Sequence, residues 1–154
     1  MGAQPVFTSQ LPWKTGRKVE TLVINCSAWD FRPYFAEFAE KYLKFTEYDH
    51  LAVPGGIQIL SMASFFVKLA SMMMKWVEFL VTHHGLKKIV ILGHDDCSWY
   101  KDFRFGPIHV DLKKRQIDDL LAVAQMLRSK LNIAVEIYFA QPQADGKVVF
   151  SAIS

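Results

Sequence analysis

Two kinds of segment alternate along this chain, and that alternation sets the class of fold. Short apolar runs rich in β-branched residues, typical of strands buried on both faces, occur at 19–26, 48–53, 87–92, 134–140 and 147–153. Longer stretches with apolar residues every three or four positions, typical of helices, lie between them at 33–45, 61–85 and 111–131. The order predicts an α/β fold, with a mainly parallel central sheet of about four to five strands and helices on both faces.

The two ends of the chain differ from this regular middle. Residues 1–17 show no period, which predicts an irregular leader followed by a single α/β domain over 18–154. The last two apolar runs are separated by Pro142 and an Asp145-Gly146 pair. Because such a turn joins neighbouring strands, we expect the last strand to join the sheet in the antiparallel direction.

Composition and charge exclude several classes of protein. The chain is 51% hydrophobic and 21% charged, which is unlike a disordered protein. Its net charge is +3, with Lys and Arg dispersed, so no nucleic-acid partner is expected. It has only two cysteines, Cys26 and Cys97, and the first residues lack the basic and apolar regions of a signal peptide. Both observations favour a reducing compartment, the cytoplasm.

The segment 61–85 is the longest apolar stretch and has a single narrow polar stripe. A membrane span is the alternative to a buried helix. It is disfavoured because Lys68, Lys75 and Glu78 would lie in the hydrocarbon, each at a cost of about 2.5 kcal/mol or more. We therefore expect a helix whose wide apolar face packs partly on the sheet and partly on a second subunit.

Ligands of open α/β sheets bind beyond the carboxyl ends of the strands, and two of these ends are unusual. The first predicted strand ends at Cys26, and the third is followed at once by Gly93-His94-Asp95-Asp96-Cys97. Two thiolates and one imidazole at one sheet edge are the ligand set of a zinc site with three protein ligands and a fourth position for water or substrate. Spacing alone leaves open a second interpretation, two unrelated buried cysteines and a loop histidine.

Three segments of the chain resemble β-class carbonic anhydrases. Ile24-Asn25-Cys26-Ser27 resembles the family's strand that ends in C-x-D-x-R, 53–56 (VPGG) resembles its Asn-Ala-Gly loop, and 88–97 (KIVILGHDDC) resembles its strand followed by G-H-x-x-C. The order of these segments and the long helix between them match from about residue 19 to residue 97.

This resemblance implies a Zn²⁺ ion on Cys26, His94 and Cys97 and a homodimer or higher homo-oligomer. It also implies a lyase activity, the hydration of carbon dioxide or a related small molecule to a product such as bicarbonate by zinc-bound hydroxide. Three further residues are expected to orient the ligands without binding the metal themselves: Gly55, Gly56 and Asp96.

One part of the family pattern is missing. The aspartate and arginine of C-x-D-x-R are replaced by Ala28 and Asp30. A D-x-R triplet occurs two residues later as Asp30-Phe31-Arg32, and a loop insertion could return Asp30 and Arg32 to the ion as catalytic residues. Asp30 could instead cap the following helix or take the fourth metal position.

Two other functions are consistent with the sequence. A non-catalytic zinc-binding or interaction module of the same fold would explain the missing pair. A cysteine phosphatase is the lesser alternative, because Cys26 and Arg32 satisfy C-x5-R. It is disfavoured because the loop has no glycine, Asp30 would repel a phosphate, and Pro33 removes a backbone donor.

Carbon dioxide hydration also needs an apolar pocket and a path for protons. Aromatic residues close to Cys26 in sequence could line the pocket: Trp29, Phe31 and Phe35. Histidine is the side chain that titrates near neutral pH, and the candidates for proton transfer are His50, His83, His84 and His109.

Overall fold

The structure, a computed structural model, describes residues 4–13, 18–102 and 111–154. Within these residues one sheet has the strand order β2-β1-β3-β4-β5. The strands are β1 (Thr21–Cys26), β2 (Asp49–Val53), β3 (Lys88–His94), β4 (Ala134–Pro142) and β5 (Val148–Ala152). All neighbours are parallel except β4 and β5, which are antiparallel. The predicted α/β fold, with its antiparallel last strand, is confirmed.

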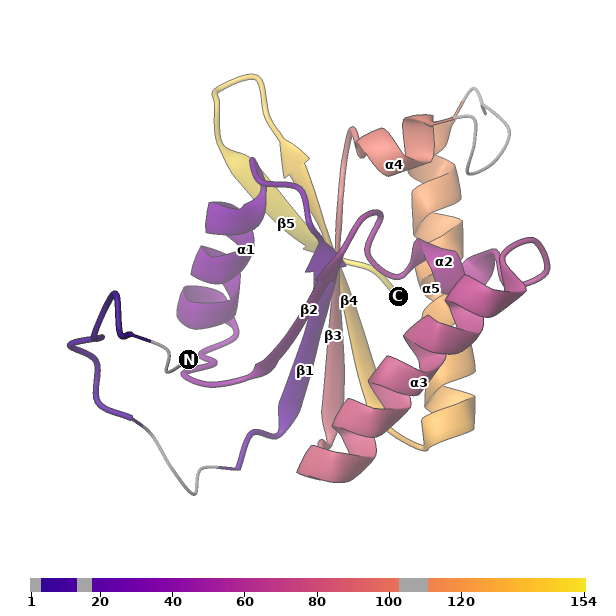
Figure 1. Cartoon of the computed structure of the whole chain (residues 1–154). Helices are drawn as coiled ribbons and strands as arrows, with labels where there is room; N and C mark the ends of the chain where they lie inside the picture. The colour runs from indigo at the N-terminus through magenta and orange to yellow at the C-terminus, as the bar shows by residue number, and fades with distance from the viewer. Residues whose placement is uncertain (1–3, 14–17, 103–110) are drawn as a thin grey trace.

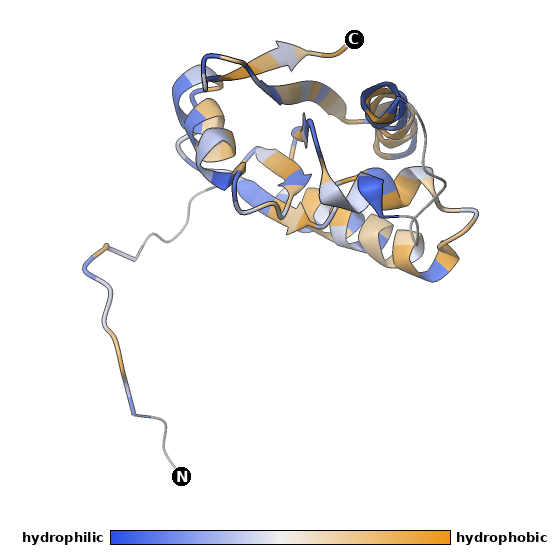
Figure 2. Ribbon diagram, turned by 90° about the horizontal axis from the view of Figure 1, so that it is seen from above, coloured by the Kyte–Doolittle hydropathy of each residue, from blue (hydrophilic) through white to orange (hydrophobic). Residues whose placement is uncertain are grey.

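Helices cover both faces of this sheet (Figure 1). One face carries α1 (Arg32–Glu37), which continues into a π-helical turn, η1 (Phe38–Tyr42). The other face carries α2 (Gln58–Ser61), α3 (Val67–His84) and α5 (Leu112–Leu131). Residues 4–13 form neither helix nor strand and run away from the sheet as an extended segment (Figure 2).

The central strands are apolar on both sides because both sides are covered. In β1, Leu22 and Ile24 pack in the larger cluster with α3 and α5, whereas Val23 packs with Phe35 and Phe38 in the smaller cluster. Successive side chains of a strand point to opposite faces, so a continuous apolar run supplies two cores at once. This explains why β1 reads as an unbroken run rather than an alternating pattern.

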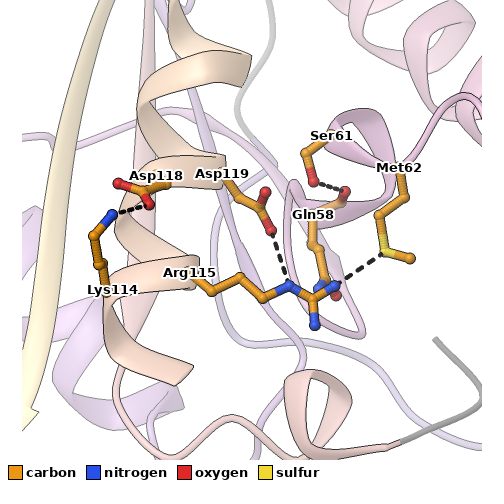
Figure 3. Close-up of polar contacts among 7 residues, drawn as sticks. All are labelled: Gln58, Ser61, Met62, Lys114, Arg115, Asp118 and Asp119. Atoms are coloured by element: carbon orange, nitrogen blue, oxygen red, sulfur yellow. Dashed lines mark hydrogen bonds and ion pairs between the residues drawn. The ribbon is translucent and has the colours of Figure 1, made fainter. Parts of the chain in front are cut away.

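The long helix predicted over 61–85 is interrupted, and this is a correction. After α2 the chain turns, with the backbone N–H groups of Phe65 and Phe66 both bonding to the carbonyl of Met62 at 2.9 and 3.0 Å. Arg115 of α5 reaches the Met62 sulfur at 3.9 Å (Figure 3). The sequence did not indicate this turn because Ser61, Ser64 and Lys68 keep the helical step across it.

Other element ends also differ from expectation. The helix predicted over 33–45 ends as a π-helical turn at Tyr42, and β3 continues two residues beyond the predicted end at 92. Pro142, expected in the turn, is the last residue of β4 and pairs with Val148. None of the helices in the described residues combines the length and the hydropathy needed to cross a membrane.

Candidate metal centre

The three predicted ligands meet at the carboxyl edge of the sheet. Cys26 ends β1, His94 ends the neighbouring parallel strand β3, and Cys97 directly precedes α4 (Ser98–Lys101) as its N-cap residue. One ligand atom from each lies within 4.8 Å of the other two, and the two sulfur atoms are 3.8 Å apart. All three residues are less than a tenth exposed. The structure therefore favours one shared site over two unrelated cysteines.

His94 belongs to β3 rather than to the predicted loop, which is a correction of the sequence analysis. It pairs with Ala140 of β4, and the next N–H, that of Asp95, donates to the Ala140 carbonyl at 2.9 Å. Asp96 then adopts a left-handed conformation with φ 58°. This turn directs the chain back so that Cys97 faces Cys26.

The imidazole of His94 is held in one orientation. Its Nδ1 lies 2.7 Å from the carbonyl oxygen of Asp95, so Nδ1 carries the proton and donates it. Its Nε2 is buried and has no hydrogen-bond partner. The Phe31 ring lies against the imidazole, with 4.2 Å between ring centroids. A histidine that donates one ring nitrogen to a carbonyl and leaves the other bare is arranged as a metal ligand.

Both sulfur atoms receive backbone hydrogen bonds. The N–H of Gly55 donates to the Cys26 sulfur at 3.3 Å, and the N–H of Ala28 also bonds to it. The Cys97 sulfur is bonded by the N–H groups of Trp99 and Tyr100 at the start of α4. Donors around sulfur stabilise negative charge, as a metal-bound thiolate requires.

The two thiols titrate as a pair. Contact with the Cys97 thiol, opposed by burial and aided by His94, lowers the pKa of Cys26 to about 4. The same contact, together with burial, raises the pKa of Cys97 far above its usual range. The metal-free pair therefore keeps one proton near neutral pH, and a divalent cation would have to displace it.

The donor set fits zinc. Two buried sulfurs and one bare imidazole nitrogen are ligands that Zn²⁺ takes at about 2.0 to 2.3 Å. The fixed tautomer of His94 and the backbone donors at both sulfurs are the supporting contacts that such a site needs.

The two glycines after β2 bring their backbone close to Cys26. Gly55 has φ 71°, and a Cβ atom on it would lie 2.3 Å from Cδ1 of Trp99. Gly56 has φ 61°, and a Cβ atom there would lie 3.3 Å from the backbone nitrogen of Cys26. Only glycine fits both the conformation and the space, so the loop approaches the sulfur closely enough to donate to it.

An open cleft of about 520 Å³ leads to the three ligands. Asp30, Asp96 and Trp29 are among the residues that line it. The Asp96 carboxylate is 76% exposed and forms an ion pair with Lys101, so it faces solvent beside the ligands. The Asp30 carboxylate accepts a hydrogen bond from the Phe31 N–H at 3.2 Å and is not one of the three grouped ligands.

Only one of the two residues of the displaced D-x-R triplet lines the cleft of the ligands. Asp30 lines both the cleft of the cysteines and an adjoining cleft of about 770 Å³, whereas Arg32, the first residue of α1, lines only the adjoining cleft, with Asn25 and His50. Ala28 packs against the two cysteines where the family pattern has an aspartate. Arg32 is therefore not among the residues that line the cleft of the ligands.

The predicted aromatic residues lie partly at the site, and the predicted histidines lie elsewhere. Phe31 and Phe35 pack against His94, with ring centroids 4.2 and 6.1 Å from the imidazole, but Trp29 is 85% exposed at the rim. Of the histidine candidates, none that the structure describes lines the cleft. His50 bonds to Asn25 at 2.5 Å, His84 to Asp49 at 2.5 Å, and His83 stacks on Phe79. His109 lies outside the described residues.

Sequence reasoning missed Gln116, whose side-chain amide donates to the backbone carbonyl of His94 at 2.8 Å. A signal was present. Gln116 occupies the same helix face as Leu120, Val123 and Leu127, and a polar residue on a core-facing stripe calls for a buried partner.

Comparison with known proteins gives a likeness in structure only. No protein-family model matches the sequence, and no curated protein matches it significantly. β-Carbonic anhydrase isoform I of the protozoan Trichomonas vaginalis aligns over 92% of this chain and 87% of its own, with 14% identity and a TM-score of 0.50.

Two fungal proteins align similarly. One of two tetrameric β-carbonic anhydrases of Sordaria macrospora covers 90% of this chain and 84% of its own, with 15% identity and a TM-score of 0.49. A β-carbonic anhydrase of Aspergillus fumigatus covers 92% and 94%, with 13% identity and a TM-score of 0.49.

The Trichomonas alignment shows the fold, which is an α/β fold like that of β-carbonic anhydrases. Together with the grouped side chains it defines the class of protein, a β-carbonic-anhydrase-like fold with a candidate Cys-His-Cys metal site.

Proposed function

We propose that this chain binds one zinc ion through Cys26, His94 and Cys97 and hydrates carbon dioxide or a related small neutral molecule. The observation that carries the proposal is the bare, buried Nε2 of His94 beside two sulfurs that both accept backbone hydrogen bonds. A site prepared in this way at the carboxyl edge of this fold is suited to a metal, and the cleft gives a small substrate access to it.

When bound, zinc supplies a Lewis acid that acidifies water and so provides the nucleophile for carbon dioxide. Residues of the chain supply the apolar surroundings and the proton acceptor. Phe31 and Phe35 keep the His94 side of the site apolar, which suits a substrate without charge. Asp30 is the lining carboxylate that we assign to orient water and accept its proton, and Arg32 receives no contact with substrate in this proposal.

A non-catalytic zinc module is the second candidate, and one observation favours it. Arg32 does not line the cleft of the ligands and Ala28 replaces the expected aspartate, so the family's pattern of an Asp and an Arg beside the ligands is not reproduced by these positions. The phosphatase alternative gains no support, because its arginine would have to line the cleft of Cys26.

Metal analysis and stopped-flow kinetics test the proposal together. The full chain, purified without added metal, should carry close to one zinc per chain, and Cys26→Ser should lose it. Carbon dioxide hydration should exceed that of buffer with the same amount of free zinc. Zinc without hydration would establish the non-catalytic module, and a metal-free wild-type chain would overturn both candidates.

We also infer a homo-oligomer that uses α3. Its outer face exposes Leu69, Met72, Trp76 and Phe79 to 56, 48, 47 and 57%. These residues follow one another by three, four and three positions, so they form a single apolar stripe along the helix. Burying such a stripe against a second copy removes it from water, as the sequence analysis expected.

The remaining expectations belong to the same proposal. Residues 18–154 act as one domain, and the protein works in the cytoplasm, where cysteines stay reduced and available to a metal. The irregular leader expected over 1–17 stays part of this proposal, and residues 1–3 and 14–17 of it lie outside the described residues.

A further inference from the structure

Gln116 on α5 makes a contact that the proposed metal chemistry does not explain by itself. Its side chain is 4% exposed, and its Nε2 donates to the backbone carbonyl of His94 at 2.8 Å. The side chain lies behind the ligands, where Gln116, Cys26, His94 and Cys97 line a small cavity of about 20 Å³. It therefore reaches the site through this small cavity and does not line the open cleft.

The His94 carbonyl needs such a partner because of where β3 ends. The carbonyl and the following N–H of a trans peptide point in opposite directions. The N–H of Asp95 bonds to Ala140 of β4, so the carbonyl of His94 faces the side of β1. Pairing between β1 and β3 stops at Asn25 and Leu92. A buried carbonyl beyond the last strand pair must be bonded by something else, and Gln116 supplies the donor.

Gly93 allows the helix to come this close. A Cβ atom at Gly93 would lie 2.7 Å from Cδ1 of Leu120 and 3.0 Å from Cδ2 of Phe139. Because Gly93 has no side chain, α5 packs directly on the end of β3. Gln116 lies one helical turn before Leu120 and is thereby placed next to His94.

We propose that Gln116 is a positioning residue that fixes the backbone of His94 and so keeps Nε2 aimed at the metal site. The inference rests on the proposed metal site and deepens it. Without the amide donor the carbonyl is left unpaired, and the end of β3 must move to find water or another donor. Because His94 turns with this backbone, metal affinity should fall, by roughly tenfold, as is typical when a group that supports a ligand is lost.

The test compares zinc affinities of full-length variants by competition with a chromophoric chelator, and follows the absorption of the cobalt-substituted proteins. Gln116→Met keeps the length of the side chain and removes the donor. Gln116→Glu keeps its shape but, when ionised, presents only acceptors to the carbonyl. Both should bind zinc at least about tenfold more weakly than wild type and shift the cobalt spectrum.

Two control variants separate positioning from general stability. Gln125→Met makes the same change at an exposed site on the same helix, and Val123→Ala loosens the core that α5 shares with the sheet. Both should keep wild-type affinity and spectrum, although Val123→Ala melts earlier. Wild-type affinity in both Gln116 variants, or an equal loss in Val123→Ala, would overturn the positioning role alone. A wild-type chain that binds neither metal would overturn the proposed function and this inference together.

Discussion

Cys26 and Cys97 place their sulfur atoms 3.8 Å apart although 71 residues separate them along the chain. The contact exists because β1 and β3 are adjacent parallel strands and a short left-handed turn after β3 brings the chain back. Each sulfur also accepts backbone N–H groups, from the loop after β2 and from the start of α4. The pair is thus built by four separate segments.

The charge state of this thiol pair leads to a pH prediction for the metal-free protein. The pKa of Cys26 is lowered to about 4, chiefly by the Cys97 thiol, so Cys26 is already a thiolate between pH 6 and pH 8. Its alkylation, followed by mass spectrometry, should be almost independent of pH between pH 6 and pH 8. In Cys97→Ala the main cause is gone, the pKa moves back toward 9.0, and alkylation should rise with pH over that interval. A steep rise already in the wild type would contradict the shift.

The same shift predicts how metal-free stability changes with pH. Below the ordinary thiol pKa of 9.0, the unfolded Cys26 binds a proton that the folded thiolate does not. Its contribution is therefore complete above pH 9 and is lost as the pH falls toward 4. Urea unfolding of the wild type should show a larger fall in stability between pH 8 and pH 6 than Cys26→Ala does. If the wild type and Cys26→Ala lose the same stability between pH 8 and pH 6, the lowered pKa of Cys26 is contradicted.

Gly55 should be intolerant of any side chain. Gly55→Ala must adopt φ 71° and would place its Cβ 2.3 Å from the Trp99 ring, whereas Gly146→Ala must adopt φ 80° with nothing within 4 Å. Both variants bear the left-handed strain, and Gly55→Ala adds an overlap of about 1–3 kcal/mol. Urea unfolding should rank Gly55→Ala below Gly146→Ala by at least about 1 kcal/mol. Equal losses would show that Trp99 moves aside freely.

Asp30 should matter for turnover and not for metal binding. If it orients water and accepts the proton, Asp30→Asn should lower carbon dioxide hydration by about a hundredfold while zinc content stays at the wild-type level. Asp118→Asn is a matched control, since Asp118 is an exposed partner of Lys114 on α5 and does not line the cleft. Loss of zinc from Asp30→Asn would instead make Asp30 a metal ligand.

The apolar stripe of α3 should hold the oligomer together. Trp76→Lys puts a charge in the middle of the stripe and should shift the protein to monomers in analytical ultracentrifugation. Lys75→Glu changes a charge on the neighbouring, polar side of the helix and should leave the oligomer intact. A monomeric wild-type chain, or a Trp76→Lys variant that stays assembled, would exclude this interface.

Part of the candidate site could be predicted from the amino-acid sequence, because the information is local. A strand that ends in Cys26 and another that leads into Gly93-His94 identify donors by residue type and by their place at strand ends. The tautomer of His94 could not be predicted. It depends on the Asp95 carbonyl being 2.7 Å away, which follows from a backbone turn that no periodicity indicates.

The sequence by itself determined the alternation of strands and helices and the parallel core, because burial on one or two faces leaves a repeating apolar pattern in the chain, and it indicated the three candidate donors by their residue types at strand ends. Only the tertiary structure decided that Asp30 and not Arg32 lines the cleft of the ligands, that the chain turns after Met62, and that Gln116 bonds to His94. These relations depend on strand order, register and helix packing. Each of them depends on contacts between segments that are far apart in sequence, and no short-range pattern records such contacts.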